Sequence, residues 1–181
     1  MGRGSSVDES VALMVEHERG IRPPDLLARW TTASDQLVAL LDDMERSTRV
    51  RWVARDLSAR TLATTRLSET WIHTGDVASA LGIELIATDK LRLIARLAWR
   101  TLPYAFALAG RRMSGPVEFL LVAPSGEPWA FIPDEAAVTT IFGSGLDLCE
   151  VAARRVEPSV TSLSGDGPDV EEVLSLVRTY A

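Results

Sequence analysis

Thiols are almost absent from the 181-residue sequence, which contains a single cysteine, Cys149. One thiol cannot form an internal disulfide, and it cannot build a zinc site out of several cysteines. The sequence therefore favours a reducing compartment, the cytoplasm. Histidine is also scarce, and His17 and His73 are the two examples. Because a catalytic zinc ion takes three protein ligands, this short inventory restricts how such a site could be built.

Other absences narrow the class of protein further. No apolar run approaches the roughly 20 residues that cross a bilayer, and residues 1–6 are not followed by the apolar core of a signal peptide. The formal net charge of −6 disfavours nonspecific affinity for nucleic acid. No glycine-rich phosphate or dinucleotide loop is present. We therefore expect neither a membrane nor nucleic acid among the partners.

The first half of the chain carries apolar residues at helical spacing and predicts an all-helical arrangement. The expected helices cover residues 7–19, 23–46, 58–81 and 88–108. Ser58 or Asp56 is the expected N-cap of the third helix. Thr88 is the expected N-cap of the fourth, and Pro103 should kink that helix. Residues 49–54 form a connector of mixed character.

The second half has a different residue pattern, which begins after the turn-forming residues 110–116. Residues 117–122 and 129–132 flank a Pro-Ser-Gly-Glu turn and predict a hairpin. Further strands are expected at 138–141 and 159–164, and further helices at 146–155 and 170–180. The sequence therefore predicts an α+β protein, with a helical domain over residues 1–112 and a small α+β domain over residues 115–181.

The largest group of candidate functional side chains lies on the third predicted helix. Arg66, Glu69, His73 and Asp76 are spaced 3, 4 and 3 residues apart, so they lie on one face of that helix. The i, i+4 spacing of Glu69 and His73 lets a carboxylate and an imidazole converge on one divalent cation. The same spacing is equally typical of a hydrogen-bonded pair, and Arg66 could pair with Glu69 on a salt-bridged face. Both interpretations stay open at this point.

The candidates beyond that pair are weaker. His17 lies between two glutamates near the end of the first helix, where an exposed helix end explains it. Asp76 could supply a third oxygen, but three ligands from one straight helix rarely close around one ion. Cys149 has apolar neighbours and is interpreted as a core residue rather than a nucleophile. Arg154 and Arg155 could clamp an anion, or they could complement the dipole at a helix end.

The motif Arg66-x-x-Glu69-x-x-x-His73-x-x-Asp76, together with the residues before it, resembles a known family. It is similar to the metal-binding domain of the mycothiol-dependent maleylpyruvate isomerases, which is related to DinB-like four-helix bundles. Residues 118–131 and 143–149, with the two arginines at 154 and 155, look like the small sterol-carrier-like α+β domain that follows the bundle. The resemblance spans most of residues 22–181.

The resemblance implies a divalent metal, usually zinc, with Glu69 and His73 as two of its three protein ligands. The third ligand in the family is a histidine on an earlier helix, and His17 does not lie in a matching motif. Arg155 corresponds to an arginine of the C-terminal domain that contributes to the active site. The implied cosubstrate is a small thiol, mycothiol, alongside a small-molecule substrate.

The chain also departs from the family, because the first bundle helix and its histidine have no counterpart. The expected fold is therefore an incomplete DinB-like bundle followed by the α+β domain. The uncovered flank of the bundle predicts a compensating homodimer contact, a repositioned first helix or marginal stability. Two functions follow from this. One is a zinc-binding, thiol-dependent isomerase or transferase, and the other is a non-catalytic remnant or interaction module with an incomplete metal site. A carrier of apolar ligands is a third, resting on fold analogy.

Overall fold

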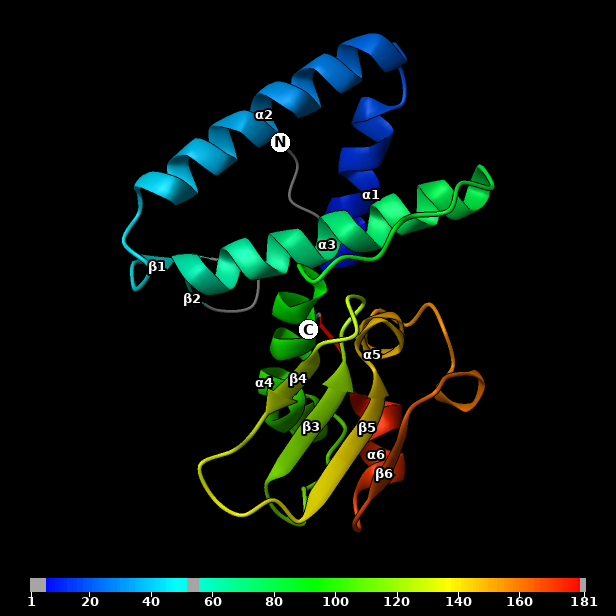
Figure 1. Cartoon of the computed structure of the whole chain (residues 1–181). Helices are drawn as coiled ribbons and strands as arrows, with labels where there is room; N and C mark the ends of the chain where they lie inside the picture. The colour runs from blue at the N-terminus through cyan, green and yellow to red at the C-terminus, as the bar shows by residue number, and fades with distance from the viewer. Residues whose placement is uncertain (1–5, 52–55, 180–181) are drawn as a thin grey trace. The chain divides into compact units, whose positions relative to one another are not determined.

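The structure of the protein is a computed structural model, which describes residues 6–51 and 56–179 (Figure 1). It is a mixed fold, with helices in the N-terminal part and a four-stranded sheet in the C-terminal part. The predicted α+β class is therefore confirmed. Contacts group the chain into two compact units, Met1–Glu45 and Arg46–Ala181, which are described separately here.

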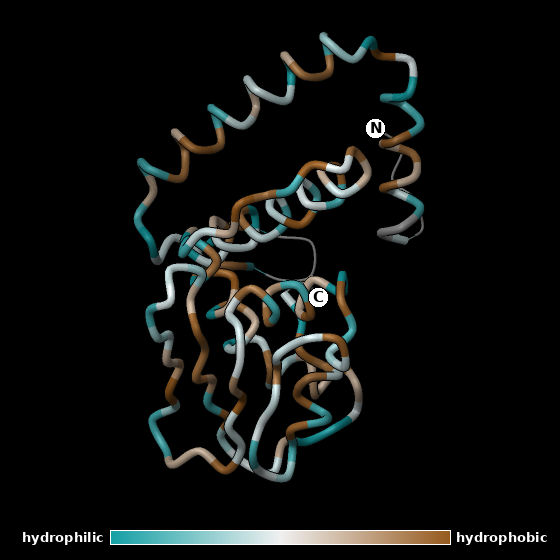
Figure 2. Tube along the Cα trace, turned by 45° about the vertical axis from the view of Figure 1, so that its right-hand side comes forward, coloured by the Kyte–Doolittle hydropathy of each residue, from teal (hydrophilic) through white to brown (hydrophobic). Residues whose placement is uncertain are grey.

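The first unit consists of two helices, α1 (Val7–Glu18) and α2 (Pro23–Asp43). The hydroxyl of Ser6 caps α1 by accepting the N–H of Glu9 at 3.1 Å. Two prolines begin α2, where their missing N–H groups break no intrahelical bond. Hydrophobic and hydrophilic residues alternate along α2, as the brown and teal segments of Figure 2 show. Both predicted helices are confirmed, with α2 ending slightly earlier than expected.

The second unit opens with a short antiparallel pair, β1 (Arg49–Val50) and β2 (Leu57–Ser58). The connector predicted at 49–54 therefore contains a strand, although its residues 52–54 lie outside the described part of the chain. Two-residue strands are too short to show the period of 2 that identifies a strand in a sequence. The pair leads directly into α3 (Ala59–Ala80), whose N-cap is Ser58, as predicted.

Helix α4 (Leu91–Leu108) begins later than expected, so the predicted N-cap at Thr88 is wrong. Thr88 instead accepts the N–H of Leu91 through its backbone carbonyl, in the turn before the helix. The Asp89 carboxylate holds that turn in place by accepting the N–H and O–H of Ser125, at 3.2 and 2.7 Å. Pro103 lies inside the continuous helix, and its kink stays a prediction.

The sheet has the strand order β4-β3-β5-β6. Its strands are β3 (Val117–Val122), β4 (Pro128–Phe131), β5 (Thr139–Ser144) and β6 (Ser164–Asp166). Strands β3 and β4 form the predicted hairpin, with Leu121 opposite Trp129, and β5 runs parallel to β3. The strand predicted at 159–164 is wrong. A 3-10 turn, Pro158–Val160, takes its place, where Pro158 has no N–H to offer a sheet.

Two further helices complete the second unit, α5 (Gly145–Ala152) and α6 (Val170–Leu176). Both were predicted, and both are shorter than expected. Along β3 the residues alternate between buried and exposed positions, so one face of the sheet is covered. Helices α4, α5 and α6 share one hydrophobic core with that face, centred on residues such as Phe106, Phe119, Ile141, Leu148 and Val173.

The packing of α4 bears on the domain division. This helix was assigned to the helical domain, yet its buried residues belong to the same core as the sheet. The contacts also divide the chain into two units between Glu45 and Arg46, not near residue 112. A division into residues 1–112 and 115–181, with an incomplete bundle in the first part, therefore stays a prediction. Among the described residues, no helix combines the length and the apolarity needed to cross a bilayer.

Candidate functional site on helix α3

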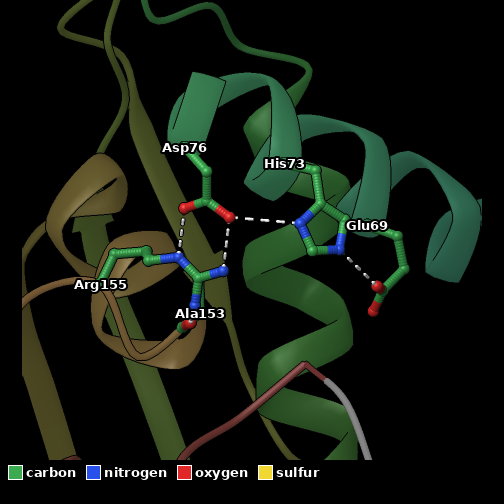
Figure 3. A network of polar contacts seen from close by, with 5 residues as sticks. All are labelled: Glu69, His73, Asp76, Ala153 and Arg155. Atoms are coloured by element: carbon green, nitrogen blue, oxygen red, sulfur yellow. Dashed lines mark hydrogen bonds and ion pairs between the residues drawn. The ribbon is translucent and has the colours of Figure 1, made fainter. Parts of the chain in front are cut away.

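The polar stripe of α3 meets the end of α5 in a small network of charged side chains (Figure 3). Glu69, His73 and Asp76 come from α3, and Arg155 follows the C-terminus of α5. The structure therefore brings together three residues that the helical spacing aligned and one that lies 79 residues away from Asp76. All four belong to the second compact unit.

The imidazole of His73 lies between two carboxylates. Its Nδ1 is 3.2 Å from Oδ2 of Asp76, and its Nε2 is 3.5 Å from Oε2 of Glu69. A neutral ring that donates from Nδ1 to Asp76 presents the lone pair of Nε2 toward Glu69. The ring is 68% exposed, so a solute can reach this lone pair.

Arg155 fixes the carboxylate of Asp76. Its Nε and Nη2 donate to the two carboxylate oxygens at 2.6 and 2.8 Å, and its Nη1 donates to the carbonyl of Ala153 at 2.8 Å. These hydrogen bonds, more than the weaker one from His73, lower the pKa of Asp76 from its usual 3.8 to about 2. Asp76 is therefore a carboxylate throughout the neutral range, available as the acceptor for His73.

The backbone at the end of α5 explains how Arg155 reaches α3. The N–H of Arg154 bonds to the carbonyl of Val151 at 2.9 Å, and the N–H of Arg155 bonds to that of Glu150 at 3.0 Å. This pattern is a Schellman motif, which places Arg154 in the left-handed region at φ 60°. Glycine usually occupies such a position because a Cβ is unfavourable there. The turn redirects the chain and leaves Arg155, rather than Arg154, facing Asp76.

The remaining sequence candidates lie apart from this network. Within the described residues, Arg66 is exposed and forms no ion pair with Glu69. His17 is 80% exposed beside Glu18, as expected for a helix end. Cys149 is completely buried, its Sγ lies 3.6 Å from the carbonyl of Leu91, and burial raises the pKa of its thiol. The interpretation of Cys149 as a core residue is confirmed.

The donor set fits a metal ion only in part. Two ligands on a tetrahedral zinc ion, each about 2.0–2.1 Å from the metal, lie roughly 3.3 Å apart. The 3.5 Å between Nε2 of His73 and Oε2 of Glu69 matches two such positions. Asp76 does not add a third, because Arg155 and His73 occupy its oxygens. In the described ranges, 6–51 and 56–179, no group of three His, Cys, Asp or Glu residues is arranged to hold a metal.

Comparison with known proteins connects this stripe to a family. A family model described as the mycothiol maleylpyruvate isomerase N-terminal domain matches residues 2–78. Residues 2–78 are therefore similar to this domain family. The matched region of the mycothiol maleylpyruvate isomerase N-terminal domain contains Glu69, His73 and Asp76, whereas Arg155 lies outside it. The match therefore indicates a mycothiol-related, isomerase-like domain over these residues.

Two relatives extend the similarity beyond the matched domain. They are uncharacterised proteins from two strains of Mycobacterium tuberculosis, each 34% identical to this chain over 164 residues. The alignment covers 89% of this chain and 63% of each relative. The chain thus spans less than two thirds of the length of these relatives, whose names specify no activity.

Proposed function

We propose that this chain, whose residues 2–78 match the mycothiol maleylpyruvate isomerase N-terminal domain, binds zinc through Glu69 and His73. The observation that carries the proposal is the orientation of His73, whose Nδ1 is engaged by Asp76 while its Nε2 faces the Glu69 carboxylate. Ligand histidines of metal sites are commonly oriented in this way, with a carboxylate on the nitrogen that does not bind the metal. Asp76 then acts as the orienting group rather than as a third ligand.

The activity we propose is that of a thiol-dependent isomerase or transferase, with mycothiol as the cosubstrate and a small molecule as the substrate. Zinc, when bound, supplies a Lewis acid that favours the thiolate form of such a cosubstrate. Glu69 and His73 hold the ion, Asp76 keeps the proton of His73 on Nδ1, and Arg155 keeps Asp76 charged. Arg155, which by the resemblance corresponds to an active-site arginine, thus acts in this proposal through Asp76 as a positioning residue. A reducing cytoplasm suits both the lone cysteine and a thiol cosubstrate.

A second candidate function is a non-catalytic interaction module with an incomplete metal site. It is favoured by the absence of a third ligand near Glu69 and His73 in the part of the chain that the structure describes. This candidate includes the proposed homodimer. It predicts weak zinc binding together with self-association, which light scattering on the eluting protein would measure.

Metal analysis of the full chain separates the two functions. We expect one zinc per chain in the wild type and in His17→Ala, which removes the other histidine, and loss of zinc in His73→Ala. Asp76→Asn should keep the ligands but weaken zinc binding by about 10- to 100-fold, as outer-shell changes do. A wild-type chain that stays empty after zinc is added back would reject the zinc proposal and favour the interaction module.

The cosubstrate needs its own measurement. We expect the zinc-loaded chain to bind mycothiol and to shift the apparent pKa of its thiol downward, and His73→Ala to lose both effects. Ultraviolet absorbance of the thiolate against pH would report the shift. A zinc-loaded chain that leaves the thiol unaffected would retain the metal proposal and reject the thiol-dependent activity.

A further inference from the structure

A concave site lies in the same compact unit as the Glu69–His73 pair, near the N-terminal end of α3. The cavity has a volume of about 300 Å³ and is formed by the β1–β2 pair, the first turns of α3 and one face of α4. Arg60 of its lining is 13 residues from His73, which corresponds to about 20 Å along the helix axis. The cavity is therefore too distant to share substrate atoms with the Glu69–His73 pair.

The lining of this cavity is strongly basic. Arg49, Arg60, Arg96 and Arg100 face it, and Asp56 is the one acidic residue among the lining side chains. Four positive charges and one negative charge leave a net charge of +3 around the cavity, in a chain whose net charge is −6. Such a local reversal of charge concentrates anions at the site.

Most of this charge is not neutralised within the protein. Arg49 donates to the backbone carbonyl of Asp56. In the described ranges, the guanidinium groups of Arg60, Arg96 and Arg100 have no carboxylate partner. Arg96 and Arg100 are also one turn apart on α4, and like charges at this spacing repel each other. An oxyanion between them would remove the repulsion and match the donor geometry of the guanidinium groups.

The N-terminal end of α3 offers an anion in the cavity its helix dipole but few free backbone donors. The N–H of Ala59 bonds to the carbonyl of Thr48 at 2.8 Å, and the N–H of Arg60 bonds to that of Arg46 at 3.3 Å. The N–H of Thr61 is taken by the Ser58 hydroxyl at 3.2 Å. Because these backbone donors are occupied, an anion in the cavity would depend on the arginine side chains.

The remaining lining limits the size and kind of ligand. Leu57, Leu93 and Leu97 give the basic cavity an apolar wall, and its volume lies at the lower end of the range for small-molecule sites. The geometry points to a binding site for a small soluble dianion, a phosphate ester or a dicarboxylate with a short carbon skeleton. Its charged ends contact Arg60, Arg96 and Arg100, and its carbon atoms contact the leucines.

Calorimetric titration of the full chain at low ionic strength tests this site, with inorganic phosphate and succinate as the two probes. We expect at least one probe to bind saturably with one site per chain. Arg96→Gln on α4 and Arg60→Gln on α3 should each weaken binding about tenfold, because each removes a charge-assisted contact. Two variants on different helices guard against a fold defect in either, which circular dichroism would detect.

The matched control is Arg112→Gln, which removes the same charge from an exposed arginine outside the cavity and should leave the affinity unchanged. His73→Ala should also leave it unchanged, so this outcome is independent of the zinc proposal. The inference is overturned if neither probe binds up to about 10 mM, or if Arg112→Gln weakens binding as much as Arg96→Gln and Arg60→Gln. The probe that binds more tightly identifies the phosphate or the carboxylate class.

Discussion

At the scale of single residues, the carboxylate of Asp76 bonds to two side chains, Arg155 and His73. Its charge and its position therefore affect the whole network. Arg155 contacts both oxygens, and His73 shares Oδ2. The carboxylate therefore stays ionised at pH values where a free aspartic acid is protonated. The orientation of His73 depends on a charge that is maintained by a residue from another element.

The acid stability of the protein should report this charge. The pKa of Asp76 is about 2 in the folded chain and near 3.8 when unperturbed, so ionised Asp76 favours the folded state above about pH 4. That advantage is lost as the pH falls toward 2. We expect the wild type to be more stable than Asp76→Asn at neutral pH, and the difference to disappear between pH 4 and 2. Urea unfolding at a series of pH values measures it.

Asp35→Asn is the control for this pH series, since Asp35 is exposed on α2. It should show no such pH-dependent difference from the wild type. A gap between the wild type and Asp76→Asn that persists unchanged to pH 2 would contradict the assigned role of Arg155.

Part of this network was accessible from the sequence. Glu69 and His73 could be predicted as a pair because a helix places a spacing of four residues on one face. The contact of Asp76 with Arg155 could not be predicted from periodicity, because the two residues are 79 positions apart. The Schellman turn could not be predicted from the sequence either. Glycine usually marks its left-handed position, but Arg154 occupies that position here.

At the scale of elements, a buried carboxylate ties α6 to the segment that precedes the sheet. Asp169, next to α6, is 5% exposed and accepts the N–H and the O–H of Ser114, both at 2.7 Å. Its own N–H lies 3.3 Å from Oγ1 of Thr139 on β5. One residue thus connects a helix, a strand and the turn that leads into β3.

Removing this carboxylate should be costly. Asp169→Ala removes a buried, charged acceptor of the N–H and the O–H of Ser114, so we expect the free energy of unfolding to fall by about 2 kcal/mol. Chemical denaturation measures the loss. Asp166→Ala, an exposed substitution on β6, is the matched control and should change stability by less than about 0.5 kcal/mol. Equal losses in the two variants would contradict the proposed connection.

The helices and strands differed in how well they could be predicted from the sequence. The helical periodicity of α3 and the turn within the β3–β4 hairpin are strong local signals, and both elements were predicted correctly. The β1–β2 pair was missed because its strands are too short to show alternation. The 159–164 segment was misassigned because Pro158 begins a 3-10 turn there, and a strand begins only at Ser164.

At the scale of the whole molecule, burial is unevenly distributed along the chain. Every buried residue in the described ranges lies between Ala59 and Thr179, within the second compact unit. No residue of α2 is buried. Local stability follows the density of buried apolar contacts, so the two units should differ in how readily they open.

Hydrogen exchange should make this difference visible. We expect the amides of α4, β3 and β5 to exchange slowest, and those of α1 and α2 to exchange at least about tenfold faster. Mass spectrometry of peptides from the exchanging chain gives both rates in one experiment. Protection of α2 equal to that of α4 would contradict this expectation. Protection of α2 that grows with protein concentration would instead support the proposed homodimer.

The contact between Asp76 and Arg155 also has a consequence for the order in which the molecule is made. As α3 leaves the ribosome, it already carries Glu69 and His73 at helical spacing, but the residue that fixes Asp76 is still 79 positions away. Contacts between such distant residues form late, because the intervening loop must be closed first. During synthesis, His73 is therefore present before the contacts that orient its ring have formed. The ring of His73 is held by Asp76 and Arg155 only when the end of α5 has reached α3.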